Sequence, residues 1–211
     1  MIESNLNIEV SVTQVVSTSK IVSAHEFIIV YQCLELDMCK KIIDKFEISD
    51  HKTEGKVAHS DGNIRISEDK ITHDLWIAEL DEWKAEYSVI DQAIEPCIRD
   101  YGSRSPILQA VNVGLNEYKV IRYEKGKGVF QWHADATGAK ALARQVAIVL
   151  YLNDVPLGGE TEFFHQGIKI KPAAGQLLLF PVCWTYMHRG LMPESNHKYI
   201  VTSFLELMHL G

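Results

Sequence analysis

The sequence predicts an α+β fold in which helices from the N-terminal half support one face of a barrel of strands. Apolar residues recur at helical spacing in two segments between about residues 35 and 100. From about residue 108 to 208, short β-rich runs alternate with turn signals such as Gly158-Gly159. Because helices come first and strands second, with no linker or internal repeat, we expect one domain spanning residues 1–211.

The composition excludes several classes of protein. Apolar residues make up 46% of the chain, and the formal net charge of −7 argues against a nucleic-acid partner. No basic region followed by an apolar run opens the sequence, and no run is long enough to span a bilayer. We therefore expect a cytoplasmic protein without a membrane partner; nothing in the sequence indicates its oligomeric state. The cysteines lack C-x-x-C spacing and are expected to be free thiols: Cys33, Cys39, Cys97 and Cys183.

The N-terminal half predicts two helices among short strands. Partial alternation in residues 1–24 indicates one or two strands, and the apolar run 27–31 another. Apolar residues at helical spacing predict a helix over 35–46 and a longer one over 71–99, which Pro96 should end or kink. Trp76 and Trp83 are among the apolar residues of the longer predicted helix and are expected to pack in the core. The polar stretch 50–69 is typical of a long loop, which in a compact domain is often functional.

The C-terminal half predicts several short strands separated by turns. Such spacing is typical of an all-β sandwich or barrel. The predicted strands are 111–123, 143–152, 161–164, 168–170, 176–180 and 198–207.

The stretch Y-E-K-G-K-G-V-F-Q-W-H-A-D, residues 123–135, contains the candidate metal ligands. On an extended strand, residues i and i+2 share a face, so His133 and Asp135 could lie side by side. A third ligand would complete the two-histidine, one-carboxylate set that leaves iron(II) with open positions for substrate and oxygen. The candidate is His188, and a basic residue, Lys198, follows ten positions later.

Together with L-Y-L-N-D at 150–154 and G-G-E-T at 158–161, this series closely resembles the prolyl 4-hydroxylase branch of the 2-oxoglutarate- and iron(II)-dependent dioxygenases. The resemblance covers residues 118–204, about half of the chain. It implies a double-stranded β-helix, or jelly roll, buttressed by the N-terminal helices. It also implies Fe(2+), 2-oxoglutarate as co-substrate, O2, and ascorbate as reductant.

Carried over by motif position, the resemblance assigns a role to nine residues. The metal ligands, which are also the catalytic residues, would be His133, Asp135 and His188. Lys198 would pair with the distal carboxylate of 2-oxoglutarate. The remaining residues would line the co-substrate pocket (Tyr123, Tyr151 and Thr161) or bind substrate (Arg144 and Phe204).

Elementary chemistry agrees with these roles. A buried distal carboxylate needs a cation, which Lys198 supplies. Alternation along the last strand places Lys198 and Phe204 on one face. Arg144 and Tyr151 are an odd number of positions apart, so a bulge, or a strand that begins after Arg144, is needed to bring both inward.

The implied activity is hydroxylation of prolyl residues in a peptide or protein, giving succinate and CO2. The same chemistry on another target, such as a free amino acid, another side chain or a small molecule, is the alternative. A non-catalytic jelly-roll binding module would lack one of the ligands or Lys198, and all of them are present in this chain.

Overall fold

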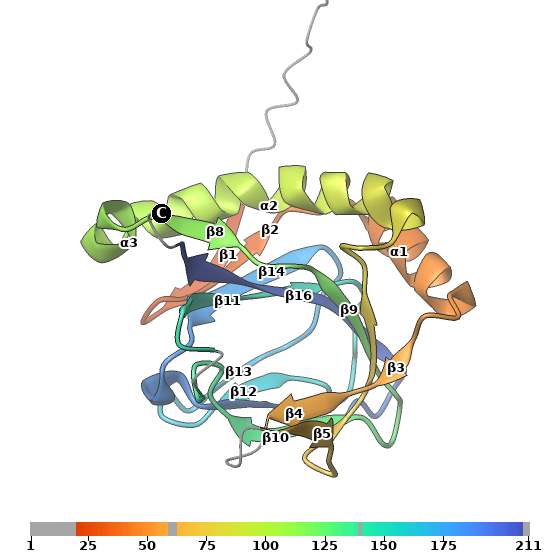
Figure 1. The fold of residues 1–211 in the computed structure, drawn as a ribbon. Helices are drawn as coiled ribbons and strands as arrows, with labels where there is room; N and C mark the ends of the chain where they lie inside the picture. Colours follow the sequence, from red (N-terminus) through yellow and green to blue (C-terminus); the bar gives the residue numbers. More distant parts are fainter. Residues whose placement is uncertain (1–19, 59–62, 139–140, 209–211) are drawn as a thin grey trace, which may run out of the picture.

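A computed structural model of the chain describes residues 20–58, 63–138 and 141–208. Two antiparallel sheets face each other and form a jelly roll, as the sequence predicted (Figure 1). The large sheet has nine strands, and eight of them form its continuous path. In spatial order these are β1 (Lys20–His25), β2 (Ile28–Gln32), β14 (Gln176–Pro181), β11 (Arg144–Tyr151), β16 (Lys198–Leu207), β9 (Lys119–Tyr123), β7 (His73–Trp76) and β3 (Thr53–Glu54).

The ninth strand, β8 (Val113–Leu115), pairs with one end of β16. The small sheet has five strands, and a two-stranded hairpin lies beside it (Figure 1). Its spatial order is β13 (Ile168–Ile170), β12 (Thr161–Phe163), β15 (His188–Gly190), β10 (Val129–His133) and β6 (Lys70–Ile71). The hairpin consists of β4 (Lys56–Ala58) and β5 (Ile64–Ile66).

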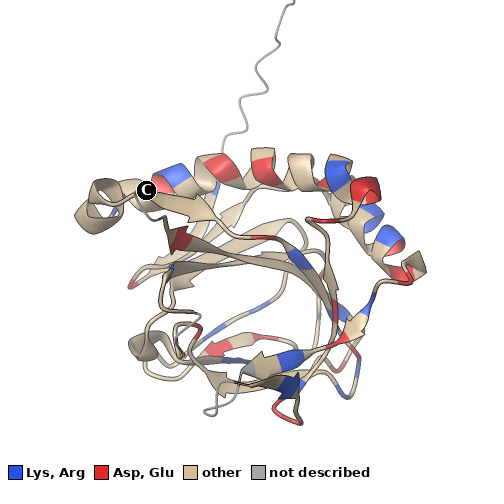
Figure 2. Ribbon diagram, viewed as in Figure 1, with Lys and Arg blue, Asp and Glu red and all other residues tan. Residues whose placement is uncertain are grey.

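Three helices cover the outer face of the large sheet: α1 (Leu36–Ile48), α2 (Lys84–Ser103) and α3 (Pro106–Ala110) (Figure 1). Charged residues recur along α1 and α2 (Figure 2), whereas the residues that these helices bury recur every three or four positions. None of the helices in the described part of the chain combines the length and apolarity needed to cross a bilayer.

The large sheet is buried on both faces, so its strands serve two cores. In β11, Val146, Ile148 and Leu150 pack with the helices. The alternate residues Ala147 and Tyr151 pack with side chains between the two sheets. The helices therefore hold the large sheet rigid from outside, and its inner face is left to form the site.

The core between helices and sheet should make a large contribution to stability. Ile94 of α2 is fully buried there, so Ile94→Ala is expected to lower the free energy of unfolding by about 2–5 kcal/mol. Ile107 of α3 is 70% exposed, and Ile107→Ala should change it by less than about 0.5 kcal/mol. Urea unfolding of both variants checks this, and equal losses would contradict the position of the core.

The prediction of a helix over 71–99 is wrong at its start. The segment opens with β7, which pairs with β9, and a 3-10 turn at Asp81–Trp83 precedes α2. In β7, Leu75 is buried but Trp76 is 50% exposed, so only Trp83 of the two tryptophans lies in the core. A four-residue strand carries too little periodicity of its own, and its partner strand decides its conformation.

Pro96 does not end the long helix, which continues to Ser103. A proline inside a helix removes one backbone hydrogen bond. The buried residues on both sides of it, Ile94 and Cys97, hold this part of α2 against the sheet, and that packing outweighs the loss.

Several other expected segments differ from the structure in part. The expected loop 50–69 contains β3, β4 and β5, although residues 59–62 lie outside the described part. The expected strand 111–123 divides into β8 and β9. The alternation that predicted strands in 1–24 is at residues 10–16, which lie outside the described part, and β1 begins after it at Lys20. The four cysteines, all within the described residues, form no disulfide bond.

Candidate active site

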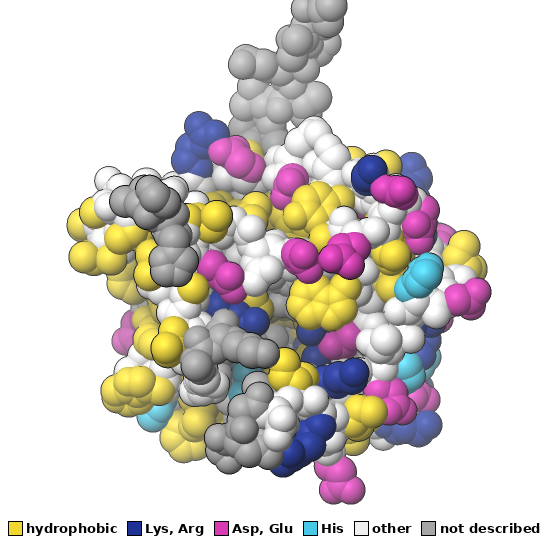
Figure 3. Space-filling view, in the orientation of Figure 1, with side chains coloured by type: hydrophobic (Ala, Val, Ile, Leu, Met, Phe, Trp, Pro, Cys, Tyr) yellow, Lys and Arg dark blue, Asp and Glu magenta, His cyan; other side chains and the backbone are white. Residues whose placement is uncertain are grey.

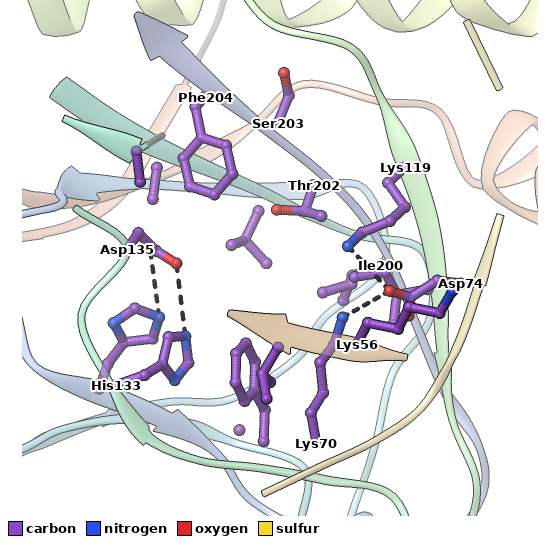
Figure 4. Close-up of a pocket in the computed structure, with 18 of the residues that line it drawn as sticks. Lys56, Lys70, Asp74, Lys119, His133, Asp135, Ile200, Thr202, Ser203 and Phe204 are labelled. Carbon is purple, nitrogen blue, oxygen red and sulfur yellow. Dashed lines mark hydrogen bonds and ion pairs between the residues drawn. The ribbon is translucent and has the colours of Figure 1, made fainter. Parts of the chain in front are cut away.

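A cavity of about 640 Å³ lies between the two sheets. Figure 3 shows this side of the molecule, where the surface is hollowed between the sheets, and Figure 4 shows side chains of the cavity. Eight of the nine residues singled out in the sequence line it, from Tyr123 to Phe204. The ninth, Tyr151, lies behind the wall and is hydrogen-bonded to one of the eight, Thr161.

The two histidines and Asp135 converge at one end of the cavity. His133 ends β10 and lies directly opposite His188, the first residue of β15. One ligand atom from each of the three residues lies within 4.8 Å of the other two. Asp135 Oδ1 is 3.6 Å from His133 Nε2, and Asp135 Oδ2 is 3.6 Å from His188 Nε2 (Figure 4).

Asp135 reaches this position from a turn rather than from the strand. β10 ends at His133, so strand alternation does not place the carboxylate beside the imidazole. The turn brings Asp135 back over both rings, where its two oxygens face different histidines.

The backbone fixes which nitrogen of each histidine is free. His133 Nδ1 donates to the carbonyl oxygen of Gln131 at 2.7 Å, and His188 Nδ1 donates to that of Tyr186 at 3.1 Å. A carbonyl oxygen only accepts, so the proton of each neutral ring is on Nδ1 and the Nε2 lone pair faces Asp135. Two neutral imidazoles and one carboxylate therefore fit the donor set that iron(II) takes in non-haem oxygenases.

Burial keeps His133 neutral. Loss of solvent, with a smaller contribution from the neighbouring His188, lowers the pKa of His133 to about 3, although Asp135 opposes the shift. The ring is therefore a neutral donor at physiological pH, as a metal ligand must be.

Lys198 is a buried ammonium group with no carboxylate partner among the described residues. It begins β16 opposite Tyr123, is 1% exposed, and donates to the carbonyl oxygen of Gly159 at 2.8 Å. Its Nζ lies 4.6 Å from the ring centre of Tyr123 and 5.8 Å from that of Tyr151. Burial lowers the pKa of Lys198 to about 7, against a small opposing effect of Glu160. A charge desolvated in this way would be stabilised by an anion in the cavity.

The two tyrosines whose rings lie near this lysine are both buried. Tyr151 shares a 2.8 Å hydrogen bond with Thr161, and burial raises the pKa of both Tyr123 and Tyr151. Gly190 lies against the Tyr123 ring, and a Cβ there would come within 3.2 Å of it. The glycine thus gives the ring room to lie along the cavity wall.

Arg144 and Phe204 form another part of the wall. The Arg144 guanidinium lies 3.9 Å from the centre of the Phe204 ring and pairs with Glu206 at 3.4 Å. It also donates to the carbonyl oxygen of Asp135 at 3.3 Å. The register between β11 and β16 shifts between Arg144 and Val146. This irregularity corresponds to the bulge that was one of the two arrangements expected from the spacing of Arg144 and Tyr151.

A second group of cavity residues, Lys70, Asp74 and Lys119, was not predicted from the sequence. Asp74 lay in the segment expected to be helical, and Lys70 lay between that segment and the expected loop 50–69. Their spacing was an available signal, because Lys70, Thr72 and Asp74 alternate as polar residues on one face of a strand do.

Comparisons with known proteins match part of the sequence and the fold. Residues 118–206 match the family model of the 2OG-Fe(II) oxygenase superfamily. A search of curated proteins finds no match.

Many solved structures share the fold, at 13–20% identity among the most similar. The viral collagen prolyl hydroxylase of Paramecium bursaria Chlorella virus-1, in its 2OG complex, is 20% identical with a TM-score of 0.59, covering 83% of this chain and 92% of its own. A Trichoplax adhaerens prolyl hydroxylase, in complex with a hypoxia inducible factor peptide fragment, is 16% identical with a TM-score of 0.67, covering 90% and 84%. A Pseudomonas putida prolyl-4-hydroxylase is 18% identical with a TM-score of 0.61, covering 83% and 89%.

Proposed function

We propose that this chain, whose residues 118–206 match the family model of the 2OG-Fe(II) oxygenase superfamily, hydroxylates prolyl residues in a peptide or protein. The reaction consumes O2 and 2-oxoglutarate and inserts one oxygen atom into a C–H bond of proline. The other oxygen atom leaves in succinate, and CO2 is released.

One observation carries the proposal: three residues that could hold a metal ion and a buried lysine without a carboxylate partner in the described part of the chain line the same cavity. His133, Asp135 and His188 would hold iron(II) through the atoms that face one another. Lys198 would bind the distal carboxylate of 2-oxoglutarate, with Tyr123 and the Tyr151–Thr161 pair beside it. The 2-oxoacid would thus place its keto end at the metal and its charged end at the lysine.

When bound, iron(II) supplies the oxygen activation that couples decarboxylation of 2-oxoglutarate to C–H oxidation. The residues of the chain bind and orient. The carbonyls of Gln131 and Tyr186 hold the imidazoles in one tautomer. The apolar inner faces of both sheets keep water from the reacting groups.

Two further observations support proline as the target residue. The similar structures above are prolyl hydroxylases, and one of them contains a peptide. Arg144 and Phe204, stacked on each other in the wall, would form the surface that a peptide meets.

The test is direct assay with proline-containing peptides, iron(II), 2-oxoglutarate and ascorbate as reductant. Mass spectrometry should find one added oxygen atom on proline, with one succinate formed for each hydroxylation. The same peptides with alanine in place of proline are the control. Succinate formation without any hydroxyproline would reject the prolyl target and leave the oxygenase chemistry in place.

A further inference from the structure

Two lysines share one buried aspartate in the wall of the cavity. Lys70 Nζ lies 2.6 Å from Asp74 Oδ2, and Lys119 Nζ lies 3.0 Å from the same oxygen (Figure 4). The other oxygen, Asp74 Oδ1, accepts a 2.7 Å hydrogen bond from Thr72. We call Lys70, Asp74 and Lys119 the lysine cluster.

The cluster carries one more positive than negative charge. Among the described residues, neither Lys70 nor Lys119 forms an ion pair with any carboxylate other than Asp74. The Lys70 and Asp74 side chains are only 3% and 5% exposed, and that of Lys119 is 15% exposed, so water screens the excess charge poorly. Lys56, Glu54 and Glu117 also line the cavity, but neither glutamate forms an ion pair with Lys70 or Lys119.

The protonation of the cluster shows the same imbalance. Burial would raise the pKa of Asp74, but Lys119 and Lys70 outweigh it and hold that pKa below its usual range. Burial, and then repulsion by Lys119, lower the pKa of Lys70 to about 8, although Asp74 attracts the proton. One carboxylate is therefore insufficient for two ammonium groups, and a second anion would stabilise both.

The cluster faces the same cavity as the metal ligands. Figure 4 shows Asp135 and His133 on one side and the cluster on the other, with Thr202 of β16 between them. Lys119 is more exposed than Lys198, which is 1% exposed and lies over the tyrosine rings. The cavity thus offers a buried cation for a co-substrate and a separate pair of lysines, of which Lys119 is the more accessible, for another ligand.

We propose that Lys70 and Lys119, held in place by Asp74, bind a carboxylate of the substrate whose C–H bond is oxidised at the His133–Asp135–His188 end. The inference rests on the proposed function for the identity of that end. A single negative charge balances the cluster, so a monoanionic carboxylate fits it better than a dianionic phosphate. The carboxylate belongs either to an acidic side chain beside the target residue or to the C-terminus of a short peptide or amino acid.

Trp76 provides a readout for binding that does not depend on catalysis. Its ring lies 4.9 Å from Lys119 Nζ and lines the cavity, so its fluorescence should change when an anion replaces water at the lysine. The protein is loaded with iron(II) and 2-oxoglutarate without oxygen and titrated with four proline-containing pentapeptides. The peptides carry Glu or Gln beside the proline, each with a free or an amidated C-terminus.

We expect peptides with the required carboxylate to bind about ten- to hundred-fold more tightly than the peptide with none. If the Glu peptides alone gain affinity, the source is a side chain; if the free-acid peptides alone gain it, the source is the terminus. Lys119→Gln should remove the preference and Lys119→Arg should restore most of it. Lys84→Gln, at an exposed lysine of α2, is the matched control and should leave it unchanged.

Equal affinity of the unmodified protein for all four peptides overturns the inference, and this outcome does not depend on the folding of any variant. A preference that survives Lys119→Gln overturns it as well. Hydroxyproline is measured separately on admission of oxygen. A charge preference without hydroxyproline supports the carboxylate site and rejects only the prolyl target.

Discussion

Replacing Asp135 with alanine is expected to lower iron(II) affinity by more than about 100-fold and to abolish succinate formation. Asp135 is the only anionic member of the ligand set and faces both imidazoles at 3.6 Å. Loss of groups that merely orient a ligand already costs about 10- to 100-fold in metal affinity, so loss of the charged ligand itself should cost more. Equilibrium dialysis and a succinate assay measure the two effects.

The matched control is His165→Ala, because His165 is an exposed histidine in the loop after β12 and lies outside the cavity lining. It should retain both iron and turnover. His133→Ala and His188→Ala should behave like Asp135→Ala, with unfolding monitored to show that each variant is folded. Stoichiometric iron in Asp135→Ala would mean that another group completes the site.

Many side chains of this candidate site could be predicted from the sequence, because its chemistry depends on a few polar residue types. His133, Asp135, His188 and Lys198 are few, polar and spaced in a recognisable series. The groups that orient them are backbone carbonyls, those of Gln131, Tyr186 and Gly159. Every residue has a carbonyl, so no sequence pattern distinguishes these three.

Strand alternation predicted side-chain directions correctly where a strand was continuous and failed where it ended. Lys198 and Phe204, an even number of positions apart on β16, both line the cavity. The odd spacing of Arg144 and Tyr151 left two arrangements open, and the register shift between Arg144 and Val146 corresponds to one of them. His133 and Asp135 were expected to share a face only if both lay on one extended strand, yet β10 ends at His133 and a turn sets their approach. The period of two holds only while backbone pairing continues, and pairing is a property of the partner strand.

The lysine cluster was missed for a related reason. Lys70 and Asp74 lie on short strands that exist because β6 pairs with β10 and β7 pairs with β9. These contacts span about fifty residues of sequence. The local pattern there fits a loop followed by a helix equally well, and only the long-range pairing turns the polar residues into the cavity.

Replacing Lys198 with methionine is expected to weaken 2-oxoglutarate binding by more than about 100-fold and yet to stabilise the protein without ligand. The ammonium group is 1% exposed and has only the Gly159 carbonyl as a hydrogen-bond partner among the described residues, so its charge is held at a cost in the folded state. Methionine fills a similar volume without that charge. The affinity for 2-oxoglutarate, measured by calorimetric titration, should therefore fall, whereas the free energy of unfolding, measured with urea, should rise.

The pH dependence of stability distinguishes the removal of a buried charge from a mere change in packing. The folded pKa of Lys198 is about 7, against about 10.4 in an unfolded chain, so the unfolded chain binds more protons between these values. Stability should therefore rise with pH across this window, and Lys198→Met should remove that part of the rise. Because 2-oxoglutarate requires the charged lysine, its binding should take up a proton and weaken above pH 7, by up to about tenfold per pH unit.

Titrations in buffers of different ionisation enthalpy measure the proton uptake directly. Lys169→Met is the control, because Lys169 lies on β13 with its side chain 55% exposed and should alter neither quantity. Lys70 also has a lowered pKa and remains in both variants, so the difference between Lys198→Met and the parent protein isolates Lys198. Undiminished 2-oxoglutarate affinity in Lys198→Met would assign the distal carboxylate to another cation, and the lysine cluster would be the first to test.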